Sequence, residues 1–237
     1  MGIGRACAEA LAAAGARVVV QDINPVAAEE AVAAIRERGG IADTLISDVA
    51  DTAAFRVAIT RYERDDHRVD ILVNNAGIGS GADFVDVAED HYDRLFAVNV
   101  RAVFFCAQAV VPGMKRRRWG RLINVSSLQA VRGWPGNPHY IGAKAAVIGF
   151  ARSWAQELAP FGITANTVVP GLTRTPMVAA HYSDERASEH VRATIPMGRL
   201  GEPSDIANLV AFLASPASQF ISGQTISPNG AAFVGAM

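Results

Sequence analysis

Tyr140 and Lys144 are the residues of this sequence best suited to do chemistry together, because they stand four positions apart in the segment YIGAK. Residues at this spacing lie on one face of a helix, so the phenol and the ammonium can share a site. A nearby ammonium favours the phenolate and lowers the pKa of a tyrosine, ordinarily near 10, by roughly 1–3 units. Such a phenol can donate a proton in one direction of a reaction and accept it in the other. A partly exposed pair with a purely structural role is the alternative that this spacing leaves open.

Ser127 stands thirteen residues before Tyr140, shortly after an apolar stretch, 121–125, that is typical of a strand. Parallel sheets present functional groups at the carboxyl ends of their strands. A serine hydroxyl both donates and accepts hydrogen bonds, so Ser127 could hold a substrate oxygen beside the phenol. Between these two residues, Gln129 and Trp134 predict a mixed polar and aromatic wall for the substrate.

The beginning of the chain carries Gly2-Ile3-Gly4 ahead of an alanine-rich helix, a pattern typical of a turn that binds a dinucleotide. Asp22 follows the next predicted strand, where a carboxylate can accept hydrogen bonds from both ribose hydroxyls and would repel a 2′-phosphate. A helix-capping or turn aspartate is an alternative of similar weight on local grounds. In such folds a central strand precedes the glycine turn, and we expect that strand to be absent from this sequence.

Three further segments follow predicted strands, and the first two could contact the same ligand. They are Asp48-Val49, Asn74-Asn75-Ala76-Gly77 and Pro170-Gly171-Leu172-Thr173-Arg174-Thr175. The small residues of the second segment let the backbone approach a ligand closely. The respective alternatives are a capping aspartate, an ordinary turn, and a turn with exposed threonines.

Short β-branched stretches alternate along the chain with longer alanine-rich helical patterns. The predicted strands are 17–21, 44–46, 71–74, 121–125, 165–169 and 225–227, and their near-continuous hydrophobicity predicts burial on both faces. The predicted helices are 4–14, 26–38, 53–64, 91–114, 140–159 and one after Pro203. This alternation predicts an α/β fold: a Rossmann-type doubly wound parallel sheet in three αβα layers, forming one domain over 1–237.

Composition narrows the functional classes. The 237 residues carry a formal net charge of −1 and are 50% hydrophobic and 19% charged, which is typical of a soluble globular protein and argues against nucleic-acid binding. Two cysteines are too few for a disulfide framework, and no targeting signal is visible, so we expect a cytoplasmic protein. The five histidines lack metal-ligand spacing, and no metal is expected.

These motifs, in this order, resemble the short-chain dehydrogenase/reductase family: GIG, an aspartate after the second strand, DV, NNAG, the asparagine of FAVNV, VSS, YxxxK, and PG followed by a threonine. The resemblance implies four catalytic residues, which are Asn99, Ser127, Tyr140 and Lys144. It implies cofactor contacts from Gly2, Ile3, Gly4, Asp22, Ile23, Asp48, Val49, Asn75, Ala76, Gly77, Tyr140, Lys144, Pro170, Gly171, Thr173 and Thr175. Asn99 would anchor a water that links Lys144 to solvent.

The expected function is hydride transfer between NAD(H), in preference to NADP, and a secondary alcohol or ketone such as a polyol, a hydroxy compound or a 3-oxoacyl thioester. Ser127, Gln129, Trp134 and Tyr140 are the expected substrate contacts, and 176–198 is expected to cover them as a lid. The resemblance also implies a homo-oligomer, a dimer or a tetramer. A catalytically impaired protein that assembles or binds without turnover is the alternative, because of the expected missing strand.

Overall fold

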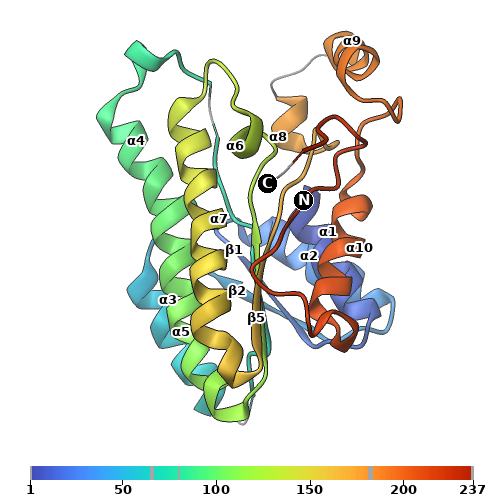
Figure 1. Ribbon diagram of the computed structural model, residues 1–237. Coiled ribbons are helices and arrows are strands. Elements are labelled where there is room, and N and C mark those ends of the chain that lie inside the picture. Colours follow the sequence, from blue (N-terminus) through green and yellow to red (C-terminus); the bar gives the residue numbers. More distant parts are fainter. Residues whose placement is uncertain (1, 65–66, 80, 181–183, 236–237) are drawn as a thin grey trace.

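The computed structural model describes residues 2–64, 67–79, 81–180 and 184–235. Parallel strands form a central layer between two layers of helices, as predicted (Figure 1). One helical layer contains α3, α4, α5 and α7, and the other contains α1, α2 and α10. The described residues start within α1 at Gly2, so they do not test whether a strand belongs before the glycines.

The predicted elements are present with small shifts at their ends. The strands are β1 (Val18–Asp22), β2 (Ala42–Ile46), β3 (Ile71–Asn74), β4 (Gly120–Val125), β5 (Ile163–Val168) and β6 (Thr225–Ile226). The α-helices are α1 (Gly2–Ala13), α2 (Pro25–Glu37), α3 (Thr52–Arg64), α4 (Glu89–Phe96), α5 (Ala102–Arg117), α6 (Gln129–Arg132), α7 (Pro138–Leu158), α8 (Pro176–Ala179), α9 (Asp184–Thr194) and α10 (Pro203–Ala214).

The strands form two separate parallel sheets rather than one. β1 pairs with β2, and the other sheet has the order β3-β4-β5-β6. Every residue of β4 and β5 is buried, as the apolar pattern predicts. The same prediction is wrong for β1 and β3, whose residues are only partly buried, with Val19 38% exposed. The cause is a cavity that both strands line.

Helix α1 joins the two sheets because it is apolar on two sides. Its Ile3 and Leu11 pack in the core cluster that holds Ile206 and Val210 of α10 together with β4 and β5. On another side, Ala8 packs in a cluster with residues of α2, β1 and β2. Packing of this helix therefore connects the β1-β2 pair to the larger sheet.

The predicted single helix over 91–114 is interrupted. A π-helical segment, Ala97–Arg101, lies between α4 and α5, and it carries Asn99 at its centre. Together they form a helical stretch, Glu89–Arg117, that is long and apolar enough to cross a membrane by length and composition alone. It packs instead against α3 and α7, and Val110 and Met114 lie fully buried in the core. A core helix of a folded domain accounts for its composition.

Candidate active site

A cavity of ≈ 2140 Å³ opens at the carboxyl ends of the strands and continues between β1 and β3. Of the site residues predicted from the sequence, Asn99 alone does not line it. The lining includes the glycine turn Gly2-Ile3-Gly4, the strand-end segments Asp22-Ile23, Asp48-Val49, Asn75-Ala76-Gly77, Pro170-Gly171, Thr173 and Thr175, and the group Ser127, Gln129, Trp134, Tyr140 and Lys144. The fold thus brings the predicted cofactor and substrate contacts to one space.

The Ser127, Tyr140 and Lys144 side chains come together because β4 and α7 are packed side by side. Ser127 follows the end of β4, while Tyr140 and Lys144 lie one turn apart on the first turns of α7. The Lys144 Nζ atom lies 5.9 Å from the centre of the Tyr140 ring and donates a hydrogen bond of 3.0 Å to the carbonyl of Val125. The predicted shared face of phenol and ammonium is therefore present.

The acid–base properties of the pair differ from the prediction. Burial raises the pKa of Tyr140 above its usual value, and a hydrogen bond with Ser127 opposes that shift only in part. Burial also lowers the pKa of Lys144 to about 8. The expected lowering of the Tyr140 pKa is thus wrong for the protein alone, because burial has the largest effect on this phenol and raises its pKa. Tyr140 is held in its protonated form at neutral pH.

Asn99 lies behind the catalytic group and not in the cavity wall. Its side chain is fully buried, and it exchanges two hydrogen bonds with the backbone of Ile78: Oδ1 accepts from N at 2.9 Å, and Nδ2 donates to O at 2.8 Å. A Cβ atom on Gly77 would stand 3.2 Å from Asn99 Oδ1 and 3.1 Å from Lys144 Nζ. The absence of that atom lets the loop after β3 fit between the asparagine and the lysine.

Two polar residues that sequence reasoning missed, Ser126 and Asn124, tie these elements together. The Ser126 hydroxyl donates a hydrogen bond of 2.6 Å to the backbone carbonyl of Lys144. Asn124 donates to the carbonyl of Val147 at 3.1 Å and accepts from Asn74 at 2.9 Å. The signal that could have identified Asn124 is its position inside the apolar stretch LINV, because a buried amide needs hydrogen-bond partners.

The glycine turn fits a dinucleotide. Gly2 has a φ of +68°, a backbone conformation that residues with a side chain adopt only with strain. A Cβ atom on Gly4 would stand 2.5 Å from Asn75 Nδ2, so only glycine lets this asparagine pack against the first turn of α1. The N-terminus of α1 consequently faces the cavity with a bare backbone, the usual arrangement for binding a pyrophosphate.

The two strand-end aspartates have different partners. Asp22 Oδ1 accepts a hydrogen bond of 2.9 Å from the backbone N of Asn24, which confirms the turn interpretation. The capping interpretation is wrong, because Asn24 itself caps α2. Asp48 forms an ion pair of 2.9 Å with Arg94 and also accepts from the Ala50 N. Asp22 lines the cavity without an ion pair among the described residues.

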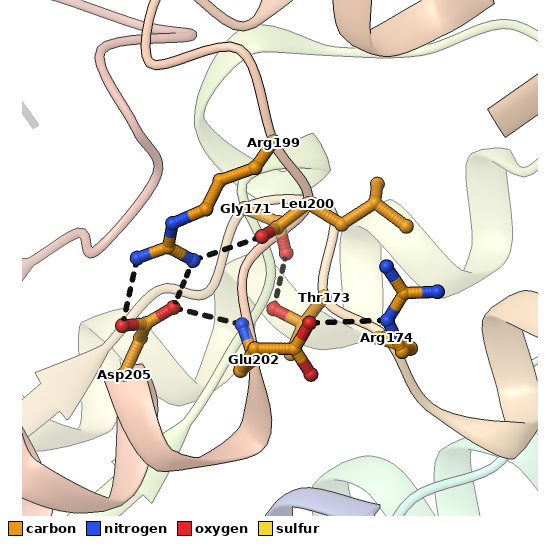
Figure 2. A network of polar contacts seen from close by, with 7 residues as sticks. All are labelled: Gly171, Thr173, Arg174, Arg199, Leu200, Glu202 and Asp205. Atoms are coloured by element: carbon orange, nitrogen blue, oxygen red, sulfur yellow. Dashed lines mark hydrogen bonds and ion pairs between the residues drawn. The ribbon is translucent and has the colours of Figure 1, made fainter. Parts of the chain in front are cut away.

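The segment after β5 is fixed by its own polar contacts. Thr173 donates to the carbonyl of Gly171 at 2.9 Å, and the Thr175 hydroxyl accepts from the Val178 N at 3.3 Å and so caps α8. The interpretation of these threonines as exposed turn residues is wrong for Thr173, which is 3% exposed. Figure 2 shows the surrounding network, in which Arg174 pairs with Glu202 and Arg199 pairs with Asp205.

The part of the cavity with the expected substrate contacts Gln129 and Trp134 is lined by α6, the loop after it, and α9. Trp134 meets His190 of α9 edge to face, with ring centres 5.9 Å apart, and the Arg132 guanidinium lies 4.9 Å from the centre of the Trp134 ring. The segment 176–198, for which a lid is predicted, contains α8 and α9. Residues 181–183 of that lid lie outside the described residues.

Comparison with known proteins gives consistent results. The family model described as enoyl-(acyl carrier protein) reductase matches residues 1–230. The chain is 37% identical over 229 residues to the 3-oxoacyl-(acyl-carrier-protein) reductase of Thermotoga maritima, covering 97% of this chain and 92% of the relative. It is 38% identical over 234 residues to the Escherichia coli enzyme of the same name, covering 98% and 93%.

Solved structures of similar proteins share the fold. A gluconate 5-dehydrogenase from Burkholderia cenocepacia, solved in complex with NADP and tartrate, superposes with a TM-score of 0.93 at 36% identity and covers 98% of this chain and 91% of its own. A putative gluconate dehydrogenase from Agrobacterium tumefaciens gives a TM-score of 0.94 at 31% identity with the same coverage. The chain is therefore an oxidoreductase that belongs to the short-chain dehydrogenase/reductase family.

Proposed function

We propose that this protein transfers a hydride between NAD(H) and the carbon of a secondary alcohol or ketone. The observation that carries the proposal is the convergence of Ser127, Tyr140 and Lys144 on the cavity that the glycine turn and Asp22 also line. A hydride donor and a proton donor are then held in one space. The bound nicotinamide supplies or accepts the hydride.

Each side chain has a role that its surroundings support. Hydride addition to a ketone leaves an alkoxide, and the Tyr140 hydroxyl, whose pKa is raised by burial and which is protonated at neutral pH, donates the proton that this oxygen needs. Ser127 hydrogen-bonds the same oxygen and positions it beside the phenol. Lys144 supplies positive charge behind the ring and stabilises the phenolate once the proton has left. Asn99 positions the loop that packs against Lys144.

NAD(H) is the proposed cofactor, although the Burkholderia relative was solved in complex with NADP. A 2′-phosphate beside the Asp22 carboxylate would bring like charges together. Two arginines that line the same cavity as Asp22 are already paired, since Arg5 contacts Glu9 at 2.8 Å and Arg17 contacts Asp43 at 2.8 Å. Their charges are therefore largely neutralised, which disfavours a phosphate at this position.

The substrate is proposed to be a hydroxy or oxo compound. The names of the relatives, 3-oxoacyl-(acyl-carrier-protein) reductase and gluconate 5-dehydrogenase, both support an alcohol–ketone pair. The alternative of a catalytically impaired protein is not favoured. Ser127, Tyr140 and Lys144 line one cavity, and the relatives are named as a reductase and a dehydrogenase, which supports an active enzyme.

A further parallel strand is proposed to fit between β1 and β3. These strands are the facing edges of the two sheets, each lacks a partner on that side among the described residues, and the cavity between them is lined by Val18, Val20, Ile71 and Val73. Unpaired backbone groups and partly exposed apolar side chains of this kind are what a central strand would satisfy.

A homo-oligomer in the cytoplasm is proposed, with α5 and α7 at the interface. Phe104 of α5 contacts Phe150 and Trp154 of α7 at ring distances of 5.5 and 6.1 Å, and Phe104 remains 37% exposed. An aromatic cluster shared by two long helices is typical of a face that pairs with a second copy.

The proposed reaction is tested by following NADH formation with a panel of secondary alcohols, polyols and hydroxy acids, and NADH consumption with the matching ketones. Turnover of at least one pair, abolished in Tyr140→Phe, is the expected result. Absence of turnover throughout the panel, despite measured binding of NADH, would refute the proposal.

A further inference from the structure

Six arginines line the cavity, and one of them differs from the others in having no acidic partner among the described residues. The six are Arg5, Arg17, Arg68, Arg94, Arg117 and Arg132. The first five each form an ion pair with an aspartate or glutamate at 2.6–3.3 Å. Arg132 has no such acidic partner among the described residues, and its guanidinium lies against the ring of Trp134. Among the side chains that the structure describes, its positive charge in the cavity therefore has no acidic partner.

The position of Arg132 is fixed relative to the catalytic group. The Ser127 hydroxyl accepts a hydrogen bond from the Gln129 N at 3.3 Å, and the helical turn continues through Arg132, whose N donates to the Leu128 carbonyl at 3.1 Å. At 1.5 Å per residue, the backbone of Arg132 stands roughly 4–5 Å along α6 from that of Gln129. Ser127 and Arg132 line the same cavity, so one substrate can contact the hydroxyl and the guanidinium together.

Two aromatic side chains complete the surroundings of this charge. The Trp134 ring supports the guanidinium from one side, an arrangement that leaves the planar edge of the arginine able to donate two parallel hydrogen bonds. His190 of α9 contacts the Trp134 ring edge to face. Burial and the charge of Arg132 lower the pKa of His190, so its imidazole adds little positive charge to this group at neutral pH.

We propose that Arg132, Trp134 and His190 form a subsite that binds the carboxylate of a small oxo or hydroxy acid whose reacting carbon lies at Ser127 and Tyr140. This proposal rests on the proposed function and names its substrate class. A carboxylate matches the two-donor edge of a guanidinium, and binding it neutralises the one uncompensated arginine among the described residues that line the cavity. The phosphates of a thioester carrier share the same chemistry, but a long flexible arm separates them from the reacting carbonyl, whereas Arg132 lies one helical turn away.

The experiment uses pairs of ketones that differ only in charge: 4-oxopentanoate with 4-oxopentanamide, and 5-oxohexanoate with 5-oxohexanamide. The value of kcat/KM is measured with NADH for wild type, Arg132→Gln, Arg132→Lys and Arg61→Gln. Arg61 is the matched control, because it is an exposed arginine of α3 that does not line the cavity.

The expected result is that wild type prefers each acid over its amide. Arg132→Gln should lower kcat/KM for the acids by about ten- to hundredfold, the range for a charge-assisted hydrogen bond, and change the amides less than about threefold. Arg132→Lys should recover part of the loss, and Arg61→Gln should leave both substrates unchanged. Equal losses for acid and amide, or no preference in wild type, would overturn the subsite while leaving the reductase activity established.

Two further arms separate the remaining outcomes. Acetoacetyl-coenzyme A is compared with its N-acetylcysteamine thioester, which lacks phosphates, and an effect of Arg132→Gln confined to the coenzyme A ester would assign the charge to a phosphate and refute the carboxylate. If wild type reduces no ketone, the proposed function fails, and binding of 4-oxopentanoate is then measured by calorimetry with NADH present. Binding that Arg132→Gln weakens at least about tenfold supports the subsite, and equal or absent binding refutes it.

Discussion

The Asn99 side chain forms two hydrogen bonds with the backbone N and O of Ile78. It satisfies the two backbone groups that a neighbouring strand would otherwise pair with. Asn99→Leu leaves both backbone groups without a partner, at about 1–3 kcal/mol for each buried group. We expect a lower melting temperature and a reduced kcat, because the Gly77 loop no longer packs correctly on Lys144. Asn166→Leu is the control, since Asn166 makes an equivalent pair of bonds, to Ile221 and Gln224, outside the cavity. Similar kcat losses in both variants at matched stability would show that Asn99 has no positioning role.

Tyr140→Phe should remove almost all turnover while changing NADH affinity only a few-fold. The ring remains and only the proton-transferring hydroxyl is lost. Steady-state rates and NADH titration by fluorescence measure the two effects. Tyr92→Phe serves as the control, because Tyr92 is an exposed tyrosine of α4 outside the cavity. Retention of a tenth of wild-type turnover in Tyr140→Phe would be incompatible with the role assigned to this hydroxyl.

The Asp22 carboxylate should make NADH bind more tightly than NADPH. Asp22→Asn removes the charge and keeps an oxygen for the Asn24 N. The dissociation constant of NADPH divided by that of NADH should therefore fall by about tenfold, which corresponds to the loss of roughly 1.4 kcal/mol of repulsion. Calorimetry with each cofactor gives both constants. The matched control is Asp51→Asn, at an exposed aspartate that caps α3 outside the cavity. Tighter binding of NADPH by the wild-type protein would contradict the assignment.

His139 should make the protein less stable in acid. It is 5% exposed, it packs edge to face on His91 at 5.1 Å, and burial together with the charge of His91 lowers its pKa. Because the folded-state pKa lies below the unfolded value of about 6.5, the unfolded state binds more protons, and stability falls as pH drops below about 6.5. His139→Phe should flatten that loss in melting temperatures measured across the range from neutral to mildly acidic pH. A half-buried histidine, His67, provides the control variant His67→Phe. An identical pH profile for wild type and His139→Phe would exclude this explanation.

A strand placed between β1 and β3 should raise both stability and cofactor affinity. An N-terminal extension of about 10 residues, carrying an apolar strand of ~5–6 residues, supplies the missing pairing. Burial of several apolar side chains at about 1.5–3 kcal/mol each is large beside the roughly 5–15 kcal/mol of a typical domain. Thermal melting and NADH titration compare the 237-residue chain with the extended one, and an extension of equal length with polar residues is the control. Equal melting temperature and NADH affinity in all three would show that no strand belongs there.

The sequence patterns placed the strands and the catalytic group well, and missed features that depend on contacts far along the chain. β3 has the predicted bounds, and YxxxK lies on one helical face, because both depend on local periodicity. The interruption of the helix at Asn99 was not foreseeable from periodicity, since its partner Ile78 lies 21 residues away. The direction of the Tyr140 pKa shift also depends on burial by surrounding elements, which spacing alone does not give.

Because α1 lies between the two sheets, its packing against α10 can change the position of the glycine turn in the cavity. Its first turn presents Gly2 and Gly4 to the cavity, while its Leu11 rests on the cluster around Val210 of α10. A shift of this helix along its axis would move the cofactor turn relative to Tyr140, which is anchored on the other side of the sheet. Misplacement of reacting groups by about 1 Å can cost about a hundredfold in rate. We therefore expect the fit of Leu11 against α10 to influence how the glycine turn is aligned with Tyr140.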